Sequence, residues 1–351
     1  MSEHPASGPA GKIADGILDD AFERHPCHYF AGLPYNINWM IQDTAPVRGF
    51  LERNPIVVAD IGARGGHMGE LEGLKPFLRY YGFDADAEEC RRLAQSPPAG
   101  FAGHRVLPYY VGKENGPVDF HIYQNPGESS GLRPSPRFRA ALNPKMAIER
   151  TVRLQSATLD RIIADECLPS PDFIKLDTQG TELDILQAGP GAVASALLIE
   201  AEVEFTEIYE GQPLFADVAQ FMRKSGFELL YLNRVFQSRP SYPGEARGQI
   251  IFGDALFGRR DDDLSRFTPE RRAIYAILLV NYGHLDIARQ IVESDSSVAA
   301  LIPGVREYFV KPQSREERAA VMSADKELCR RLHQRRTNKL AFDSDRSWPF
   351  R

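Results

Sequence analysis

From about residue 55 onward, short apolar runs of strand length alternate with segments of helical length. The predicted strands are 56–62, 80–86, 104–112, 118–123, a run from 152 to about Thr158, 172–178, 196–205, 227–232 and 249–257. The predicted helices between them are 67–78, 87–95, a segment from about Thr158, 182–188 and 213–225. Strands separated by helices predict βαβ units, and therefore an α/β fold with a mostly parallel sheet covered by helices on both faces.

The last two predicted strands, 227–232 and 249–257, are joined without an evident helix. Such a connection predicts a hairpin, and a hairpin places one antiparallel strand at the end of an otherwise parallel sheet. The run 118–123 alternates between apolar and polar residues and indicates an added edge strand. We therefore expect a Rossmann-like sheet of seven strands, mostly parallel, with a terminal antiparallel hairpin.

The composition changes on both sides of this pattern. Residues 1–50 predict an N-terminal extension, of which 1–12 are rich in Pro, Gly, Ala and Ser and are expected to be disordered. A short helix is expected from about Ala14 to Arg24. The sheet-forming domain is then expected to span 51–258.

Residues 259–351 predict a C-terminal helical region. The stretch 271–293 contains two amphipathic helical segments separated by Gly283. The basic run 329–339 indicates a solvated helix face. We expect these helices to form an appendage to the domain that contains the sheet.

Composition and charge argue against several classes of protein. The net charge of −6 and the pI of about 5.8 argue against nucleic acid as a partner. The four cysteines are scattered and include no CxxC pair, so neither a zinc site nor a disulfide framework is expected. The absence of an apolar run of about 18 residues predicts no membrane span. The first residues resemble no signal peptide, which favours a cytoplasmic protein. A homodimer remains open.

The segment VVADIGARGG suggests a ligand-binding turn. A buried strand ends near Asp60, and glycines then let the backbone turn sharply and approach a ligand. The dinucleotide fingerprint G-x-G-x-x-G is not matched, because Arg64 follows Gly62 at the second glycine position. The spacing instead suits the amino acid portion of S-adenosylmethionine, with contacts expected from Asp60, Gly62, Ala63 and Gly65. An ordinary tight turn between a strand and a helix is the alternative.

A second acidic position follows at the end of the next predicted strand. Asp84 lies 24 residues beyond Asp60, where a carboxylate can accept hydrogen bonds from both ribose hydroxyls of a nucleotide. Asp86 is the neighbouring alternative, and Ala85 is expected beside the bound cofactor. Together with the glycine turn, Asp84 predicts a nucleoside-type cofactor site.

A third motif, FIKLDTQGTELDIL, ends a strand at Asp177 and begins a helix near Glu182. Ligands of parallel α/β sheets bind at the carboxyl ends of the strands, so Asp177 is expected to face the reacting centre. The alternative is that Asp177 or Thr181 only caps the helix.

These motifs resemble the FkbM family of methyltransferases over about residues 50–258. The matching residues are Ala59–Gly66, Gly82–Ala85, Ser129–Leu132, Thr158–Asp160, Ile174–Asp177, Gly180, Glu182 and Leu186. Two departures stand out: Thr178-Gln179 replaces the family's Val-Glu, and Asp84-Ala85 replaces its Glu-Pro. Asp84 keeps a carboxylate for the ribose, whereas Gln179 removes a charge near the site.

The resemblance implies the class I methyltransferase fold, S-adenosylmethionine as cofactor and O-methylation of a hydroxyl on a polyketide, sugar, lipid or other small molecule. An alcohol nucleophile benefits from a general base, and Asp177 is the first candidate for it. Glu202 and Glu204 come second, and His121 third. Less favoured is a magnesium-dependent version in which Asp177 with Glu202 or Glu204 supplies oxygen ligands.

Two other functions remain as alternatives. The chain could be a catalytically inactive protein that keeps the cofactor fold and acts through its C-terminal helices. A nicotinamide-dependent oxidoreductase is disfavoured by Arg64. The acceptor pocket is expected from the loops 25–50, 124–150 and 206–212, whose arginine-rich part could meet an anionic acceptor.

Overall fold

The computed structural model describes residues 44–66, 69–95, 98–244, 246 and 248–306. The predictions for 1–12, Ala14–Arg24 and 329–339 lie outside the described residues.

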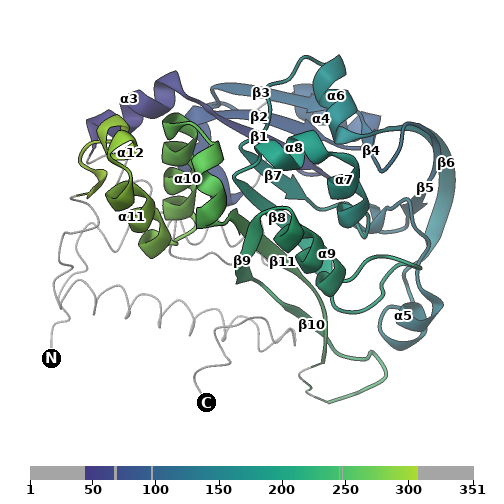
Figure 1. Cartoon of the computed structure of the whole chain (residues 1–351). Helices are drawn as coiled ribbons and strands as arrows, with labels where there is room; N and C mark the ends of the chain where they lie inside the picture. Colours follow the sequence, from purple (N-terminus) through teal and green to yellow (C-terminus); the bar gives the residue numbers. More distant parts are fainter. Residues whose placement is uncertain (1–43, 67–68, 96–97, 245, 247, 307–351) are drawn as a thin grey trace, which may run out of the picture.

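An eight-stranded sheet forms the centre of the structure (Figure 1). Its strands are β1 (Ile56–Ile61), β2 (Leu78–Phe83), β3 (Gly103–Leu107), β7 (Phe173–Leu176), β8 (Leu198–Glu204), β9 (Phe227–Leu232), β10 (Val235–Gln237) and β11 (Gln249–Arg259). The order is β10-β11-β8-β7-β1-β2-β3, and β9 also pairs with β11. The pairs from β3 to β8 are parallel, whereas β11 is antiparallel to β8, β9 and β10. The predicted parallel sheet with a terminal antiparallel hairpin is confirmed, and β10 is an additional strand.

A second, three-stranded sheet was not predicted. It consists of β4 (Tyr110–Val111), β6 (Ile148–Ala157) and β5 (Gly116–Tyr123), in that order. The expected single strand 104–112 is therefore divided between the two sheets, and 118–123 is not an edge strand of the main sheet. Pro108 lies at the division, where it lacks the backbone N–H that a continuous strand would donate.

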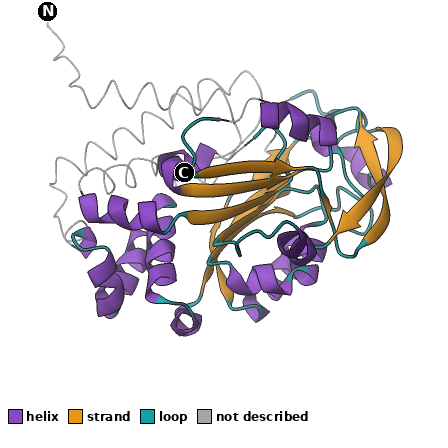
Figure 2. Cartoon of the chain, turned by 90° about the horizontal axis from the view of Figure 1, so that it is seen from above, coloured by secondary structure: helices purple, strands orange, loops and turns teal. Residues whose placement is uncertain are grey.

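Helices cover both faces of the main sheet, as Figure 2 shows from above. The α-helices are α3 (Ala45–Arg53), α4 (Ala87–Gln95), α5 (Pro136–Ala141), α6 (Leu159–Asp165), α7 (Glu182–Ala188), α8 (Pro190–Ser195), α9 (Phe215–Lys224), α10 (Pro269–Asn281), α11 (Leu285–Ser294) and α12 (Ser296–Leu301). The 3-10 helices are η1 (Gly69–Phe77), η2 (Pro126–Glu128) and η3 (Asp261–Arg266). Helices α6, α7, α8 and α9 share one hydrophobic cluster with one face of the sheet, and α3, α10, α11 and α12 share another with the opposite face.

The first crossover differs from the prediction of a regular helix over 67–78. It contains the 3-10 helix η1, which includes Pro76 and two glycines. Glycine and proline are the weakest α-helix formers, which accounts for the shorter and tighter element. Much of this sheet face is covered by α10, in which every residue from Ala273 to Asn281 is buried.

The C-terminal helices are tied to the sheet by polar contacts as well. Arg271 of α10 forms an ion pair with the buried Asp172, with 2.8 Å between Nη2 and Oδ1. The Tyr282 hydroxyl donates a hydrogen bond of 2.8 Å to Glu200 of β8. The region predicted as an appendage therefore shares one core with the sheet. No helix of the described residues is long and apolar enough to cross a membrane.

Candidate active site

The turn after β1 comes close to the strand beside it. Gly62 has a φ of +86°, and a Cβ at this position would lie 1.9 Å from the Asp177 carbonyl oxygen. Glycine is required here because any side chain would collide with the backbone after β7. Gly65 also has a positive φ, of +83°, but a Cβ there would meet nothing within 4 Å. The glycine turn thus packs against β7 on one side and leaves open space on the other, which fits the close approach of a cofactor.

Asp60, at the end of β1, lies beneath this turn. It is buried and accepts a hydrogen bond of 2.6 Å from the Tyr80 hydroxyl. Burial, followed by the charge of Asp60, raises the pKa of Tyr80 well above its usual value, so that the tyrosine remains a donor. This partnership with Tyr80 was not predicted from the sequence.

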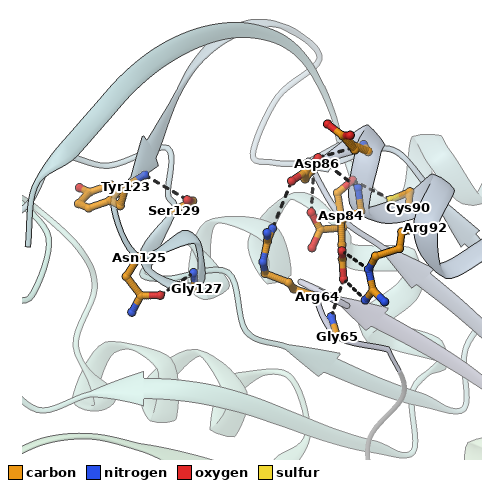
Figure 3. A network of polar contacts seen from close by, with 12 residues as sticks. Arg64, Gly65, Asp84, Asp86, Cys90, Arg92, Tyr123, Asn125, Gly127 and Ser129 are labelled. Carbon is orange, nitrogen blue, oxygen red and sulfur yellow. Dashed lines mark hydrogen bonds and ion pairs between the residues drawn. The ribbon is translucent and has the colours of Figure 1, made fainter.

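The two acidic candidates after β2 have different surroundings (Figure 3). Asp86 accepts hydrogen bonds from the backbone N–H groups of Glu88 and Glu89 at the start of α4, and its other oxygen lies 3.4 Å from Arg64 Nη1. Asp86 is therefore occupied as a helix cap. Asp84 accepts from one backbone group, the N–H of Asp86, at 2.7 Å.

Burial raises the pKa of Asp84 to about 6, and its hydrogen bond with Asp86 only partly offsets this effect. Glu89 also contributes to the site, since it accepts a hydrogen bond of 3.1 Å from the Gly65 N–H. Helix α4 thereby fixes the glycine turn beside Asp84 (Figure 3). Asp60, Gly62, Gly65 and Asp84 lie at the carboxyl ends of neighbouring parallel strands, where such sheets bind nucleotides.

Asp177 follows β7 at the same edge of the sheet. Its side chain is 29% exposed, and Lys175 Nζ lies 3.4 Å from its Oδ2. Burial alone would lower the pKa of Lys175, but the surrounding carboxylates, first of all Asp177, raise it above its usual value. The Gln179 amide donates a hydrogen bond of 2.8 Å to the other oxygen of Asp177, Oδ1. Both carboxylate oxygens are therefore held, and the group still reaches solvent.

Glu202 of β8 meets Asp177 through the same amide. Gln179 Nε2 donates a hydrogen bond of 3.0 Å to Glu202 Oε1. Desolvation and then the charge of Asp177 raise the pKa of Glu202 well above its usual value. Two of the three predicted catalytic carboxylates are therefore brought together.

Glu204 differs from Asp177 and Glu202 in its exposure to solvent. Its side chain is buried, with 2% exposed, and no hydrogen bond reaches its Oε1. Burial and then the charge of Glu182 raise the pKa of Glu204 well above its usual value. It is thus less accessible to an acceptor than Asp177.

Glu182, in the first turn of α7, shapes the loop that carries Gln179. Its carboxylate accepts hydrogen bonds from the Thr178 N–H at 2.6 Å, the Thr178 hydroxyl at 2.9 Å and the Gly180 N–H at 3.1 Å. The acidic residue in the first turn of a helix was a visible sequence signal for such a role. Neither Asp177 nor Thr181 caps this helix through its side chain.

The segment between β5 and β6 lies against the Asp177 loop. The Ser130 hydroxyl donates a hydrogen bond of 2.8 Å to the Gln179 carbonyl oxygen. The Tyr209 hydroxyl lies 2.9 Å from both Gln179 Oε1 and the carbonyl oxygen of Glu128. Parts of the predicted acceptor loops 124–150 and 206–212 are thereby brought to the site. No sequence pattern indicated the contact between Tyr209 and Gln179, because 30 residues separate them.

Two residues singled out in the sequence have structural partners. His121 is buried, and its Nδ1 lies 2.8 Å from the Thr151 hydroxyl on the neighbouring strand. Asp160 accepts hydrogen bonds of 2.8 Å from the N–H groups of Gly191 and Ala192, at the start of α8. Among the described residues, no group of three or more His, Cys, Asp or Glu side chains could hold a metal ion.

Comparison with known proteins gives a family and one curated relative. Residues 74–229 match the family model described as "Methyltransferase FkbM domain". The chain is 25% identical to 2-O-methyltransferase NoeI of Sinorhizobium fredii (strain NBRC 101917 / NGR234) over 199 residues, which cover 52% of this chain and 82% of that protein.

Solved structures match with low TM-scores. One is magnesium protoporphyrin IX methyltransferase from Synechocystis PCC 6803 with bound S-adenosylmethionine, with a TM-score of 0.31 and 11% identity, covering 74% of this chain and 100% of that one. Another is 1,6-didemethyltoxoflavin-N1-methyltransferase from Burkholderia thailandensis, with a TM-score of 0.26 and 13% identity, covering 74% and 94%.

The family match includes β2, with Asp84 just after it, the loop of Asp177 and Gln179, and β8. It confirms the resemblance drawn from the motifs and supports S-adenosylmethionine as the cofactor. The part of this chain from residue 74 to residue 229 therefore matches the methyltransferase FkbM domain family, which is the family that the motifs resemble.

Proposed function

We propose that this methyltransferase is an O-methyltransferase that transfers the methyl group of S-adenosylmethionine to a hydroxyl group of a sugar or other small molecule. The observation that carries the proposal is Asp177, an accessible carboxylate at the carboxyl end of β7, next to the glycine turn. The name of the relative NoeI, a 2-O-methyltransferase, supports an oxygen acceptor.

The cofactor would be held at the carboxyl ends of β1 and β2. Gly65 leaves room for its amino acid portion beside Ala63, Gly62 lets the turn pack against the Asp177 backbone, and Asp60 is bonded to Tyr80 beneath the turn. Asp84 has a free oxygen lone pair to offer the ribose hydroxyls, with Ala85 beside it. When bound, the cofactor supplies an electrophilic methyl group.

The chain's own contribution to the reaction would be a positioned base. An acceptor hydroxyl that reaches Asp177 can lose its proton to this carboxylate as its oxygen bonds to the methyl carbon, whose bond to sulfur would break so that S-adenosylhomocysteine leaves. Lys175 and Gln179 fix the plane of the carboxylate by holding one oxygen each. Much of the acceleration would come from aligning hydroxyl, methyl carbon and sulfur in a line. Glu202 is the second candidate, and Glu204 is the least accessible.

A basic surface next to the site favours an acceptor that carries negative charge. Five exposed cations, Arg133, Arg137, Arg139, Lys145 and Arg150, lie between β5 and β6 or at the start of β6. None of the five forms an ion pair with a described residue, whereas Arg153 nearby pairs with Asp119 at 2.6 Å. The backbone places Arg133 beside Tyr209, because the Glu210 N–H donates a hydrogen bond to the Arg133 carbonyl oxygen.

The test is a screen of hydroxylated acceptors with labelled S-adenosylmethionine, comparing the wild-type protein with Asp177→Asn. The asparagine keeps the size of the side chain but cannot accept the proton, so transfer should fall by about 10²–10⁴-fold. Binding of S-adenosylhomocysteine should remain within about a factor of three, measured by calorimetry. Transfer at the wild-type rate by Asp177→Asn would remove Asp177 as the base.

The second candidate function is a binding protein that keeps the cofactor fold without catalysis. It predicts cofactor binding with no methyl transfer to any acceptor in the screen. The alignment of Asp60, Asp84 and Asp177 along one sheet edge favours the enzyme, because a pure binding protein has no use for an accessible base.

A further inference from the structure

We infer that Gln179 is a positioning residue whose amide joins Asp177 to Glu202 and occupies the space between the two carboxylates that a bridging cation would need. The inference rests on the proposed function, because it concerns the base of that reaction. It assigns to this chain a reaction that proceeds without a bridging metal ion.

The backbone of Gln179 is held in an unusual conformation. Its φ is +59°, and among the described residues only Cys167 is another non-glycine residue with positive φ. Such a conformation is strained for a residue with a side chain, and it persists where the surrounding structure fixes it. Here the Ser130 hydroxyl holds the carbonyl oxygen of Gln179, and the adjacent Gly180, with a φ of +97°, completes the turn.

All polar atoms of the Gln179 side chain have partners. Nε2 has two hydrogens, and its two acceptors are Asp177 Oδ1 at 2.8 Å and Glu202 Oε1 at 3.0 Å. Oε1 lies 2.9 Å from the Tyr209 hydroxyl, whose single hydrogen has the Glu128 carbonyl oxygen as its other acceptor. The opposite orientation would place the amide oxygen against Asp177 Oδ1 and Glu202 Oε1 and would lose both of these hydrogen bonds.

Asp177 and Glu202 both accept a hydrogen bond from the same nitrogen, Gln179 Nε2. Two carboxylates that lie so close together repel each other when both are ionised. Proteins relieve this repulsion with a shared proton, a cation or hydrogen-bond donors. Nε2 donates to both groups at once, and Lys175 approaches Asp177 from its other oxygen. The pair is thereby stabilised by an amide and an ammonium group, and the position between Asp177 and Glu202 is filled.

Replacing this amide by a carboxylate would turn the shared hydrogen-bond donor into a third acceptor beside Asp177 and Glu202. In Gln179→Glu, three carboxylates would surround one point, and both hydrogen bonds would be lost. Three carboxylate groups are the kind of oxygen ligand set that Mg²⁺ and Mn²⁺ prefer. The other ionisable groups around the pair are Asp60, Lys175, Glu182, Glu200, Glu204, Tyr209 and Asp254.

The first experiment needs no turnover. Binding of Mn²⁺ is measured by electron paramagnetic resonance for the wild-type protein, Gln179→Glu and Gln155→Glu. Gln155 is exposed on β6, so that Gln155→Glu adds the same charge away from the site. We expect Gln179→Glu to bind Mn²⁺ at least tenfold more tightly than the other two. Equal binding by the wild-type protein and Gln179→Glu would overturn the inference, whether or not an acceptor is known.

The second experiment uses the methyl transfer reaction. We expect wild-type activity to be unchanged by EDTA. Gln179→Met, which has nearly the same volume but no donor, should lower kcat about ten- to a hundredfold at pH 7, with the KM for S-adenosylmethionine unchanged.

The pH profile separates positioning from a general loss of structure. Without the amide, the charge of Asp177 acts on Glu202 with no shared donor between them, so the acidic limb of kcat should move to higher pH in Gln179→Met. An unmoved limb, or inhibition of the wild-type protein by EDTA, would contradict the inference. If the wild-type protein transfers no methyl group to any acceptor, this result contradicts the proposed function instead. The inference about Gln179 is then tested by Mn²⁺ binding alone.

Discussion

At the scale of residues, the site combines one accessible carboxylate with others that the protein has largely removed from water. Asp84 and Asp177 both follow strands of the main sheet, but their surroundings differ. Asp84 is 9% exposed and depends on one backbone hydrogen bond, whereas Asp177 is held on both oxygens. Burial therefore makes the charge of Asp84 sensitive to pH near neutrality.

Cofactor binding should weaken in mild acid because of Asp84. Its pKa is raised to about 6, so the carboxylate that we propose as the partner of the ribose hydroxyls is ionised above that pH and protonated below it. We expect the Kd for S-adenosylhomocysteine to rise about tenfold between pH 7 and pH 5, measured by calorimetry. Asp84→Asn should bind weakly and show little dependence on pH. A wild-type affinity that stays constant across this range would argue against Asp84 as the ribose ligand.

Gly62 should tolerate no side chain. In Gly62→Ala the positive φ alone costs about 1 kcal/mol or more, and the new Cβ would displace the Asp177 backbone. We expect a lower Tm and loss of cofactor binding, measured by differential scanning fluorimetry with and without S-adenosylhomocysteine. Gly65→Ala is the matched control: it shares the positive φ but meets no atom within 4 Å, so its Tm should fall less.

At the scale of elements, α10 covers a part of the sheet that a longer helix in the first crossover would otherwise cover. The 3-10 helix η1 covers only part of the sheet face, and α10 packs over the rest with its last nine residues buried. Polar anchors fix its direction, with Arg271 near its start and Tyr282 just after its end. The carboxylate of Asp172 also accepts a hydrogen bond from the Val57 N–H, so one buried acid joins α10 to β1.

Tyr282→Phe should test the anchor at the end of α10. The change removes the hydroxyl that donates to Glu200 and should lower the free energy of unfolding by about 1–3 kcal/mol, measured by urea denaturation. Tyr242→Phe makes the same chemical change at a side chain that is 55% exposed. Equal stability of the two variants would show that the hydrogen bond to Glu200 contributes nothing.

The segment between β5 and β6 should determine the preference for charge in the acceptor. We expect the double variant Arg133→Glu/Arg139→Glu to raise the KM for an anionic acceptor about tenfold, while the Kd of the cofactor stays the same. The matched control is Arg223→Glu/Lys224→Glu, which reverses two charges at the end of α9. A KM that does not depend on ionic strength, or an equal effect in both double variants, would reject this role.

At the scale of the whole molecule, the sheet and the C-terminal helices belong to one core. Leu198 and Leu256 of the sheet and Ile277 of α10 are members of the same buried cluster, together with Phe50 of α3. The sheet face would be exposed to water without these helices, and burial of apolar area is the main source of stability. The 51–258 segment carries the site residues but only part of the core that supports them.

Ending the chain after residue 258 should therefore not give a folded enzyme. We expect the truncated protein to lose its near-ultraviolet circular dichroism and to bind 1-anilinonaphthalene-8-sulfonate, because the face that α10 covers becomes exposed. The chain ending after residue 306 retains all described helices and should keep both the signal and the cofactor affinity. Cooperative unfolding of the 258-residue form at the wild-type Tm would contradict a shared core.

The sequence by itself determined the α/β alternation, the order of the main elements and the positions of Asp60, Asp84 and Asp177. It could do so because local periodicity and glycine turns depend on neighbouring residues, and because parallel strands bring their carboxyl ends to one edge. It also indicated the terminal hairpin, since no helical segment separates 227–232 from 249–257.

Only the tertiary structure decided how these pieces meet. The second sheet, the cover that α10 provides and the contacts of Gln179 with Glu202 and Tyr209 join residues that are distant in the chain. From the sequence, Gln179 could be described only as the loss of a charge relative to the family's glutamate. In the fold, its amide donates hydrogen bonds to both Asp177 and Glu202. Which carboxylate keeps contact with water is likewise set by packing, because burial and not residue type separates Asp177 from Glu204.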